Sequence, residues 1–111
     1  MRNMNEACHE KCAEEAMFEF KLEPQYGQGF YINENPLGLN ALVIVKNESN
    51  SPVRLDITRY NRPTSNFIIL AGDEFGVELD NIQTVGIFNR GQKVAKGKII
   101  IIPNFSCINK C

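Results

Sequence analysis

Residues 67–88 constrain the fold more than any other part of this 111-residue chain. Large apolar side chains open the stretch, and a turn at Gly72-Asp73 follows them. Apolar and acidic residues then alternate until Asp80-Asn81, after which an apolar run resumes. Alternation with period two, punctuated by Gly, Asp and Asn, is typical of strands in a half-buried antiparallel sheet. The stretch therefore predicts three strands joined by two tight connections.

Further strand signals recur along the chain at spacings of about eight to twelve residues. Alternating or continuous apolar residues occupy 16–23, 29–33, 41–45, 53–58 and 99–103. Such spacings favour a sandwich or barrel over a βαβ fold, and eight strands with loops of mixed length suggest a jelly roll. We therefore predict an all-β, single jelly-roll sandwich. Residues 1–15 form an N-terminal connector arm in this prediction, and 16–111 form the body with a cysteine-bearing tail.

Charge and hydropathy argue against two classes of partner, nucleic acid and membranes. The net charge of −1 gives no overall bias toward nucleic acid or an anionic membrane. The distribution is uneven, because residues 1–23 hold six acidic and three basic residues, whereas the chain after Asp80 holds five basic residues and no acidic one. The basic stretch 90–98 lacks the aromatic residues that stack on nucleic-acid bases. No apolar run approaches the roughly 18 residues of a membrane span, and we expect no secretory signal peptide.

All four cysteines lie on the flanks of the predicted body, at Cys8, Cys12, Cys107 and Cys111. On an extended segment, residues i and i+4 lie roughly 13 Å apart, beyond the Cα separation of about 4.4–6.8 Å in a disulfide. A bridge between arm and tail is the more natural pairing, and all three connectivities stay open. Within one chain it would close a loop of about 100 residues and stabilise the fold by about 4–5 kcal/mol. Between chains it would make a covalent polymer.

Two other chemistries fit the same cysteines. Four free thiols would suit a reducing compartment, where disulfides are rare. Two Cys-x3-Cys pairs also match the ligand spacing of zinc knuckles, with His9 as a spare ligand. Structural zinc usually supports a fold without its own core, and this chain has one, so we predict no metal and no cofactor. His9 lies beside Cys8 without a third group to orient it, so a Cys–His nucleophile is not predicted.

No other constellation predicts a catalytic residue. Glu78 and Asp80 share one face of a strand, as a glycosidase pair would, but their alternation with apolar residues indicates a solvated face. The chain has no Trp, and Tyr26, Phe30 and Tyr31 form its candidate aromatic patch. That cluster supports an alternative hypothesis, a monomeric jelly-roll module that binds carbohydrate or protein.

The strand pattern resembles a known family. The segments that carry the likeness are LVIVKNES (42–49), PVRLDIT (52–58), NIQTVGIFN (81–89) and GKIIII (97–102). Together they resemble the subunits of S-type endospore appendages, small jelly-roll proteins that polymerise into fibres on the spores of Bacillus-like Firmicutes. In that family, cysteines of an N-terminal connector form disulfides with subunits of a preceding turn, and neighbouring sheet edges join. The connector often carries adjacent cysteines, whereas Cys8 and Cys12 are separated here by three residues.

The resemblance implies a structural subunit rather than an enzyme, whose partners are copies of itself in a helical fibre or stacked rings. It implies a location on the spore surface, as an extracellular appendage. The residues that it implies for intersubunit disulfides are Cys8, Cys12, Cys107 and Cys111.

Overall fold

The computed structural model describes residues 15–32 and 38–103, and all the regular structure in them is β-strand. The strands are β1 (Ala16–Leu22), β2 (Gly27–Ile32), β3 (Leu39–Asn47), β4 (Val53–Arg59), β5 (Arg62–Ile69), β6 (Glu74–Asn89) and β7 (Ala95–Pro103). Every pairing between them is antiparallel. No helix in the described part of the chain could cross a membrane.

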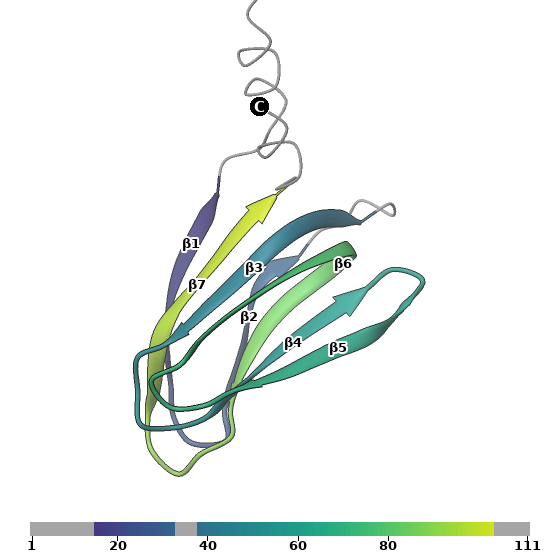
Figure 1. Cartoon of the computed structure of the whole chain (residues 1–111). Helices are drawn as coiled ribbons and strands as arrows, with labels where there is room; N and C mark the ends of the chain where they lie inside the picture. Colours follow the sequence, from purple (N-terminus) through teal and green to yellow (C-terminus); the bar gives the residue numbers. More distant parts are fainter. Residues whose placement is uncertain (1–14, 33–37, 104–111) are drawn as a thin grey trace, which may run out of the picture.

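The strands form two layers because β6 contributes to both (Figure 1). The first half of β6 pairs with β3 in the order β1-β7-β3-β6, which we call the first sheet. Its second half pairs with β4 on one side and β2 on the other, in the order β2-β6-β4-β5, which we call the second sheet. Two antiparallel layers in this order make a jelly-roll sandwich, so the predicted fold class is confirmed.

β6 is one continuous strand where the sequence predicts two strands and a connection. Asn81 adopts a φ of 56°, a left-handed conformation that asparagine tolerates better than most residues. The strand stays paired on both sides of Asn81 but exchanges β3 for β4 and β2 as its neighbours. The turn residues Asp80-Asn81 therefore bend the strand from one sheet into the other instead of ending it. The prediction of eight separate strands is corrected to seven in the described residues.

β5 also begins earlier than the sequence predicts. Residues 61–64 resemble a loop because they include Pro63, yet the strand starts at Arg62. Proline cannot donate to a ladder, so it is tolerated in sheets mainly on outer strands. β5 meets this condition because it pairs with β4 alone and borders the second sheet.

The core lies between the two sheets. It consists of the inward-facing residues of the strands, which alternate with outward-facing ones. Its buried apolar residues are Phe20, Leu22, Ala41, Val43, Val45, Val53, Leu55, Ile57, Ile69, Ile82, Val85, Ile87, Ala95, Ile99 and Ile101. They come from both sheets and form one cluster. This cluster contains no cysteine, so the packing of the described body needs no disulfide.

Arg59 of β4 holds the bend of β6 in place. Its Nε donates to the carbonyl oxygen of Asp80 at 2.9 Å, and its guanidinium forms an ion pair with the Asp80 carboxylate. Arg62 reaches the same carboxylate at 3.8 Å, and the backbone N–H of Tyr60 donates to the carbonyl oxygen of Asn81 at 2.8 Å. The hydrogen bond from Arg59 is the main reason why the pKa of Asp80 lies below its ordinary value.

Two buried asparagines, Asn47 and Asn89, connect loops through hydrogen bonds. They lie at the end of the sandwich that is opposite Glu15 and Pro103. Nδ2 of Asn89 donates to the carbonyl oxygens of Leu22 at 3.0 Å and Lys93 at 2.7 Å. Its Oδ1 accepts a hydrogen bond from Ser51 Oγ at 2.7 Å. Nδ2 of Asn47 donates to the carbonyl oxygens of Ser51 at 2.8 Å and Ile69 at 3.2 Å. The two amides thus satisfy buried carbonyl groups from several loops at once.

We expect Asn89→Ala to lower the free energy of unfolding by about 2–4 kcal/mol, because it leaves several buried polar groups without a partner. Urea denaturation of the reduced protein measures the change. The matched control is Asn50→Ala, at an exposed position of the β3–β4 loop, which should change stability by less than about 0.5 kcal/mol. Equal losses in the two variants would show that the buried amide does not stabilise the fold.

The lowered pKa of Asp80 predicts a pH dependence of stability. A carboxyl whose folded pKa lies below its unfolded value stabilises the fold above the unfolded pKa, and this contribution is lost as the pH falls through the folded pKa. We therefore expect the urea midpoint of the natural protein to fall more steeply below about pH 4 than that of Asp80→Asn. Parallel pH profiles of the two proteins would contradict this role for Asp80.

Candidate functional site

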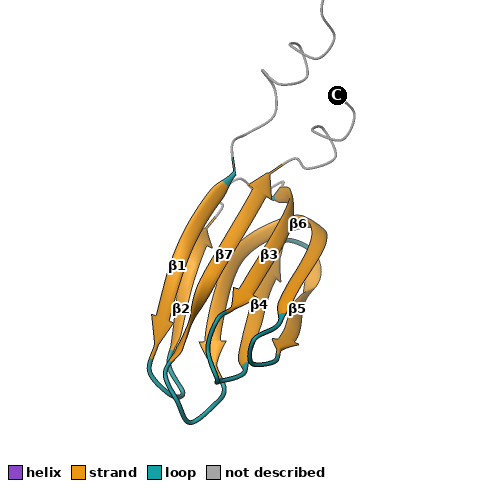
Figure 2. Cartoon of the chain, turned by 60° about the vertical axis from the view of Figure 1, so that its left-hand side comes forward, coloured by secondary structure: helices purple, strands orange, loops and turns teal. Residues whose placement is uncertain are grey.

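The residues predicted to form intersubunit disulfides are Cys8, Cys12, Cys107 and Cys111. All four lie outside the described residues, so their pairing stays a prediction. The structure does place the ends of the described body. Ala16 of β1 and Ile101 of β7 are register partners on neighbouring strands, so the described chain begins and ends at the same end of the first sheet (Figure 2).

The borders of the two sheets are the candidate assembly surfaces of the body. β1 and the first half of β6 border the first sheet, and β2 and β5 border the second. An edge strand presents N–H and C=O groups that can pair with a strand from another chain. β1 and β2 lie on one side of the sandwich, whereas β5 and the first half of β6 lie on the other (Figure 2). Edges on opposite sides of a subunit are suitable for adding copies in a line.

The hydrogen-bond pattern identifies the residues of β6 that face its open side. The N–H of Asn47 donates to the carbonyl oxygen of Asp73 at 2.9 Å, in the register of the β3–β6 ladder. In an antiparallel pair, alternate residues point both backbone groups toward the same neighbour. Every second residue counted from Asp73, Val77 among them, therefore bonds to β3. Gly76 and Glu78 turn their N–H and C=O groups away from β3, toward the open edge.

Charge distinguishes the four edges. β1 carries Glu19 and Lys21, the first half of β6 carries Glu74 and Glu78, and β5 contains Pro63. The sequence of β2 is GQGFYI, which has neither a charged residue nor a proline. Charged side chains and prolines discourage edge-to-edge pairing. β2 is therefore the least protected of the four edges.

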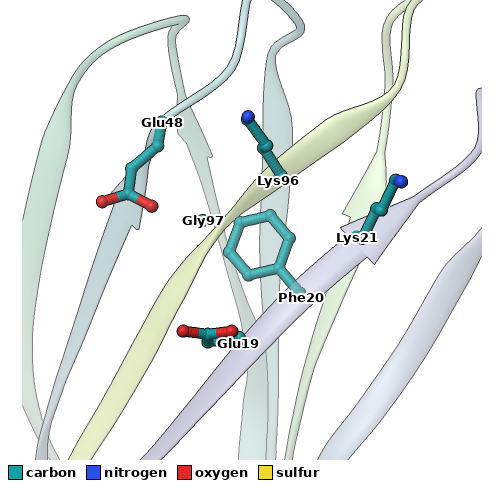
Figure 3. Close-up of a pocket in the computed structure, with 6 residues that line it drawn as sticks. All are labelled: Glu19, Phe20, Lys21, Glu48, Lys96 and Gly97. Carbon is teal, nitrogen blue, oxygen red and sulfur yellow. The ribbon is translucent and has the colours of Figure 1, made fainter.

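A shallow hollow of about 420 Å³ lies on the first sheet (Figure 3). Its lining residues are Glu19, Phe20, Lys21, Glu48, Lys96 and Gly97. The two acidic and two basic side chains come from β1, β7 and the residue after β3, and the ring of Phe20 lies among them. Among the described residues, no group of three or more His, Cys, Asp or Glu is placed to hold a metal ion. The hollow offers ion pairs and hydrogen bonds to a binding partner and contains no Ser, Cys or His nucleophile.

Glu78 and Asp80 contribute to a second hollow, of about 310 Å³, beside the bend of β6. Glu78 is exposed, as the alternation predicts, but Asp80 is half-buried and paired with Arg59. The sequence pattern does not reveal this partner, because Arg59 lies on a strand that meets Asp80 only where β6 bends. The lowered pKa of Asp80 is the opposite of what a general acid requires.

The aromatic patch expected at Tyr26, Phe30 and Tyr31 does not form as one exposed surface. Tyr26 is 66% exposed, whereas Phe30 and Tyr31 are half-buried and pack against the core. The ring centroid of Phe30 lies 6.1 Å from that of Phe18, on the neighbouring edge strand β1. Two of the three aromatic side chains are therefore used in packing, which weakens the hypothesis of a binding site at this cluster.

Comparison with known proteins shows likeness in fold but not in sequence. No protein-family model and no curated protein matches the chain. A Bacillus endospore appendage protein, from a family described as disulfide-linked pili, superposes with a TM-score of 0.56 at 11% identity, over 80% of this chain and 88% of that chain. PirA superposes with a TM-score of 0.56 at 10% identity, over 79% of this chain and 93% of that chain.

The cupin domain of Drosophila melanogaster CENP-C superposes with a TM-score of 0.50 at 12% identity. The match covers 79% of this chain but only 59% of that chain. At these identities the three likenesses show the jelly-roll architecture alone.

Proposed function

We propose that this chain is a structural subunit that self-assembles into a disulfide-crosslinked fibre, an appendage on the surface of an endospore. The observation that carries the proposal is the position of the cysteines. The described body has a complete apolar core without any cysteine, and every cysteine of the chain lies beyond it. Cysteines that a fold does not need for its own packing are available to crosslink other chains. The likeness in fold to a subunit of disulfide-linked pili supports the same function.

In this proposal the bodies join by addition of one sheet edge to another. A contact between two different edges is heterologous and continues from copy to copy, whereas a contact of like edges closes a dimer. β2 is the unprotected edge, and the edges on the opposite side of the sandwich are β5 and the first half of β6. Pro63 lies within β5, and proline discourages pairing at an edge, so we assign the partner of β2 to the first half of β6.

Charge favours this pairing over the pairing of like edges. The side chains of Glu74 and Glu78 flank the open edge of β6, so two copies of that edge would bring acidic side chains together. β2 has no charged residue, so it would place no like charge beside Glu74 or Glu78. The contact of β6 with β2 thus avoids a repulsion that would accompany a β6–β6 dimer.

The flanks then make the contact covalent. Arm and tail connect to β1 and β7, which are neighbours in the first sheet. In the proposed fibre the arm of one subunit reaches another copy, and the residues that lock this contact are Cys8, Cys12, Cys107 and Cys111. Disulfides resist dissociation in an oxidising exterior, where hydrogen-bonded edges alone would exchange.

Electrophoresis and negative-stain electron microscopy test the covalent fibre. We expect a ladder of oligomers without reductant, a single monomer band with reductant, and fibres in the untreated sample only. A variant with serine at all four cysteine positions should give the monomer band under both conditions. A monomer band in untreated natural protein would overturn the proposal.

A proline at position 78 tests the edge contact separately from the disulfides. Glu78→Pro removes an N–H group that faces the open edge but leaves the hydrogen bonds to β3 in place. We expect this variant to fold, by circular dichroism, and to form no fibres under oxidising conditions. Glu78→Ala keeps the N–H group and should still form fibres. Normal fibres from Glu78→Pro would show that the β6 edge is not used.

A further inference from the structure

The outer face of the first sheet is apolar at the end where the chain enters and leaves the described body. β1, β7 and β3 lie side by side there (Figure 2). The strand register places Met17, Ile100 and Ile44 in one row, and Ile102 and Leu42 in the next. All five side chains point away from the core, because they alternate with residues that face it. We call these five residues the outer patch.

The other half of the same face is charged. Toward the loops, the outward positions change to Glu19 on β1, Lys98 on β7 and Lys46 on β3. On β4, an interior strand of the second sheet, every outward position is polar. A sheet face that is exposed to water normally carries polar residues at its outward positions. The outer patch therefore has the composition of a covered surface.

The size of the outer patch fits a short segment better than the body of a second copy. From the strand spacing and the rise per residue, the patch with its side chains spans about 15 Å by 12 Å, or about 200 Å². A stable contact between two proteins buries roughly 800 Å² on each partner. The charged row at Glu19, Lys98 and Lys46 prevents an apolar contact from extending over the rest of the face.

The chain beyond the described residues supplies such a segment. Residues 104–111 continue from Pro103, which directly follows Ile102 of the outer patch. They contain Phe105 and Ile108 as large apolar residues, and they contain no acidic residue. A reversal of the chain takes about four residues. The remaining four still reach about 13 Å, which is enough to cross the patch.

Charge favours this tail over the N-terminal arm as the occupant of the outer patch. Glu78 of β6 borders the patch, because it is the register partner of Leu42. Residues 1–14 contain three glutamates, which Glu78 repels. The one charged side chain of residues 104–111 is Lys110, which Glu78 attracts.

We propose that residues 104–111 fold back over the outer patch of their own chain, with Phe105 and Ile108 packed against it. The contact lies within one chain, so it goes beyond the proposed fibre and does not depend on it. In a fibre it would hold Cys107 and Cys111 against the body, where the arm of another copy meets them at a fixed position.

Photo-crosslinking tests this contact in the reduced full chain. A benzophenone amino acid replaces Phe105, the protein is irradiated at low concentration, and mass spectrometry identifies the residues bonded to it. We expect most of the cross-links at the outer patch and within single chains. Ile44→Glu places a charge in the patch and should lower the yield of these cross-links at least fivefold. Thr64→Glu, at an exposed outward position of β5, should leave the yield unchanged.

The proposal is wrong if no cross-link reaches the outer patch, if cross-links are scattered over both sheets, or if they join different chains instead. Equal yields from Ile44→Glu and Thr64→Glu would also overturn it. Circular dichroism shows whether Ile44→Glu folds, and the positions of the cross-links in the chain without this change decide the question if it does not. Fibre formation is followed in the untreated natural protein, so a failure of the fibre proposal is seen separately.

Discussion

The body of this protein depends on one strand that crosses from one sheet to the other. β6 pairs with β3 as far as Ile82, with β4 from Ile82 onward and with β2 from Thr84 onward, so a single element sets the register of both sheets. The crossing requires a left-handed residue at the bend and the ion pair of Arg59 with Asp80 beside it. Close packing at the same point excludes any side chain from position 38, because a Cβ at Gly38 would lie 2.5 Å from Cα of Asn81. The left-handed conformation of Asn81, the ion pair of Asp80 and the close packing of Gly38 thus all occur at the bend.

The sequence predicts which residues of the body face the core better than it predicts how the strands connect and pair. Alternation in segments such as 53–58 is a local property, so the inward positions of Val53, Leu55 and Ile57 follow from the amino-acid pattern alone. The bend at Asn81 does not, because the same turn residues end a strand in one context and redirect it in another. The Arg59–Asp80 pair depends on which strands β6 meets at its bend and in which register, and alternation specifies neither.

The same limit applies to the candidate assembly surfaces. The flanking positions of the cysteines are visible in the sequence, whereas the identity of the edge strands emerges only from the sheet order. Once the sheet order is known, the residues of each strand can be related to the position of that strand in the sheet. The absence of charge in β2 would have no consequence in an interior strand but leaves an outer strand open to pairing. Pro63 likewise resembles a loop residue until β5 is recognised as a border.

The double membership of β6 also has a mechanical consequence for a fibre built through β2 and the open edge of β6. A neighbour that pulls on β2 transmits tension through the β2–β6 ladder into the second half of β6. From there the tension follows covalent backbone around Asn81 to the first half of the strand, where the next neighbour is attached. Stretching the edge contacts of such a fibre would therefore load the β2–β6 ladder inside each subunit.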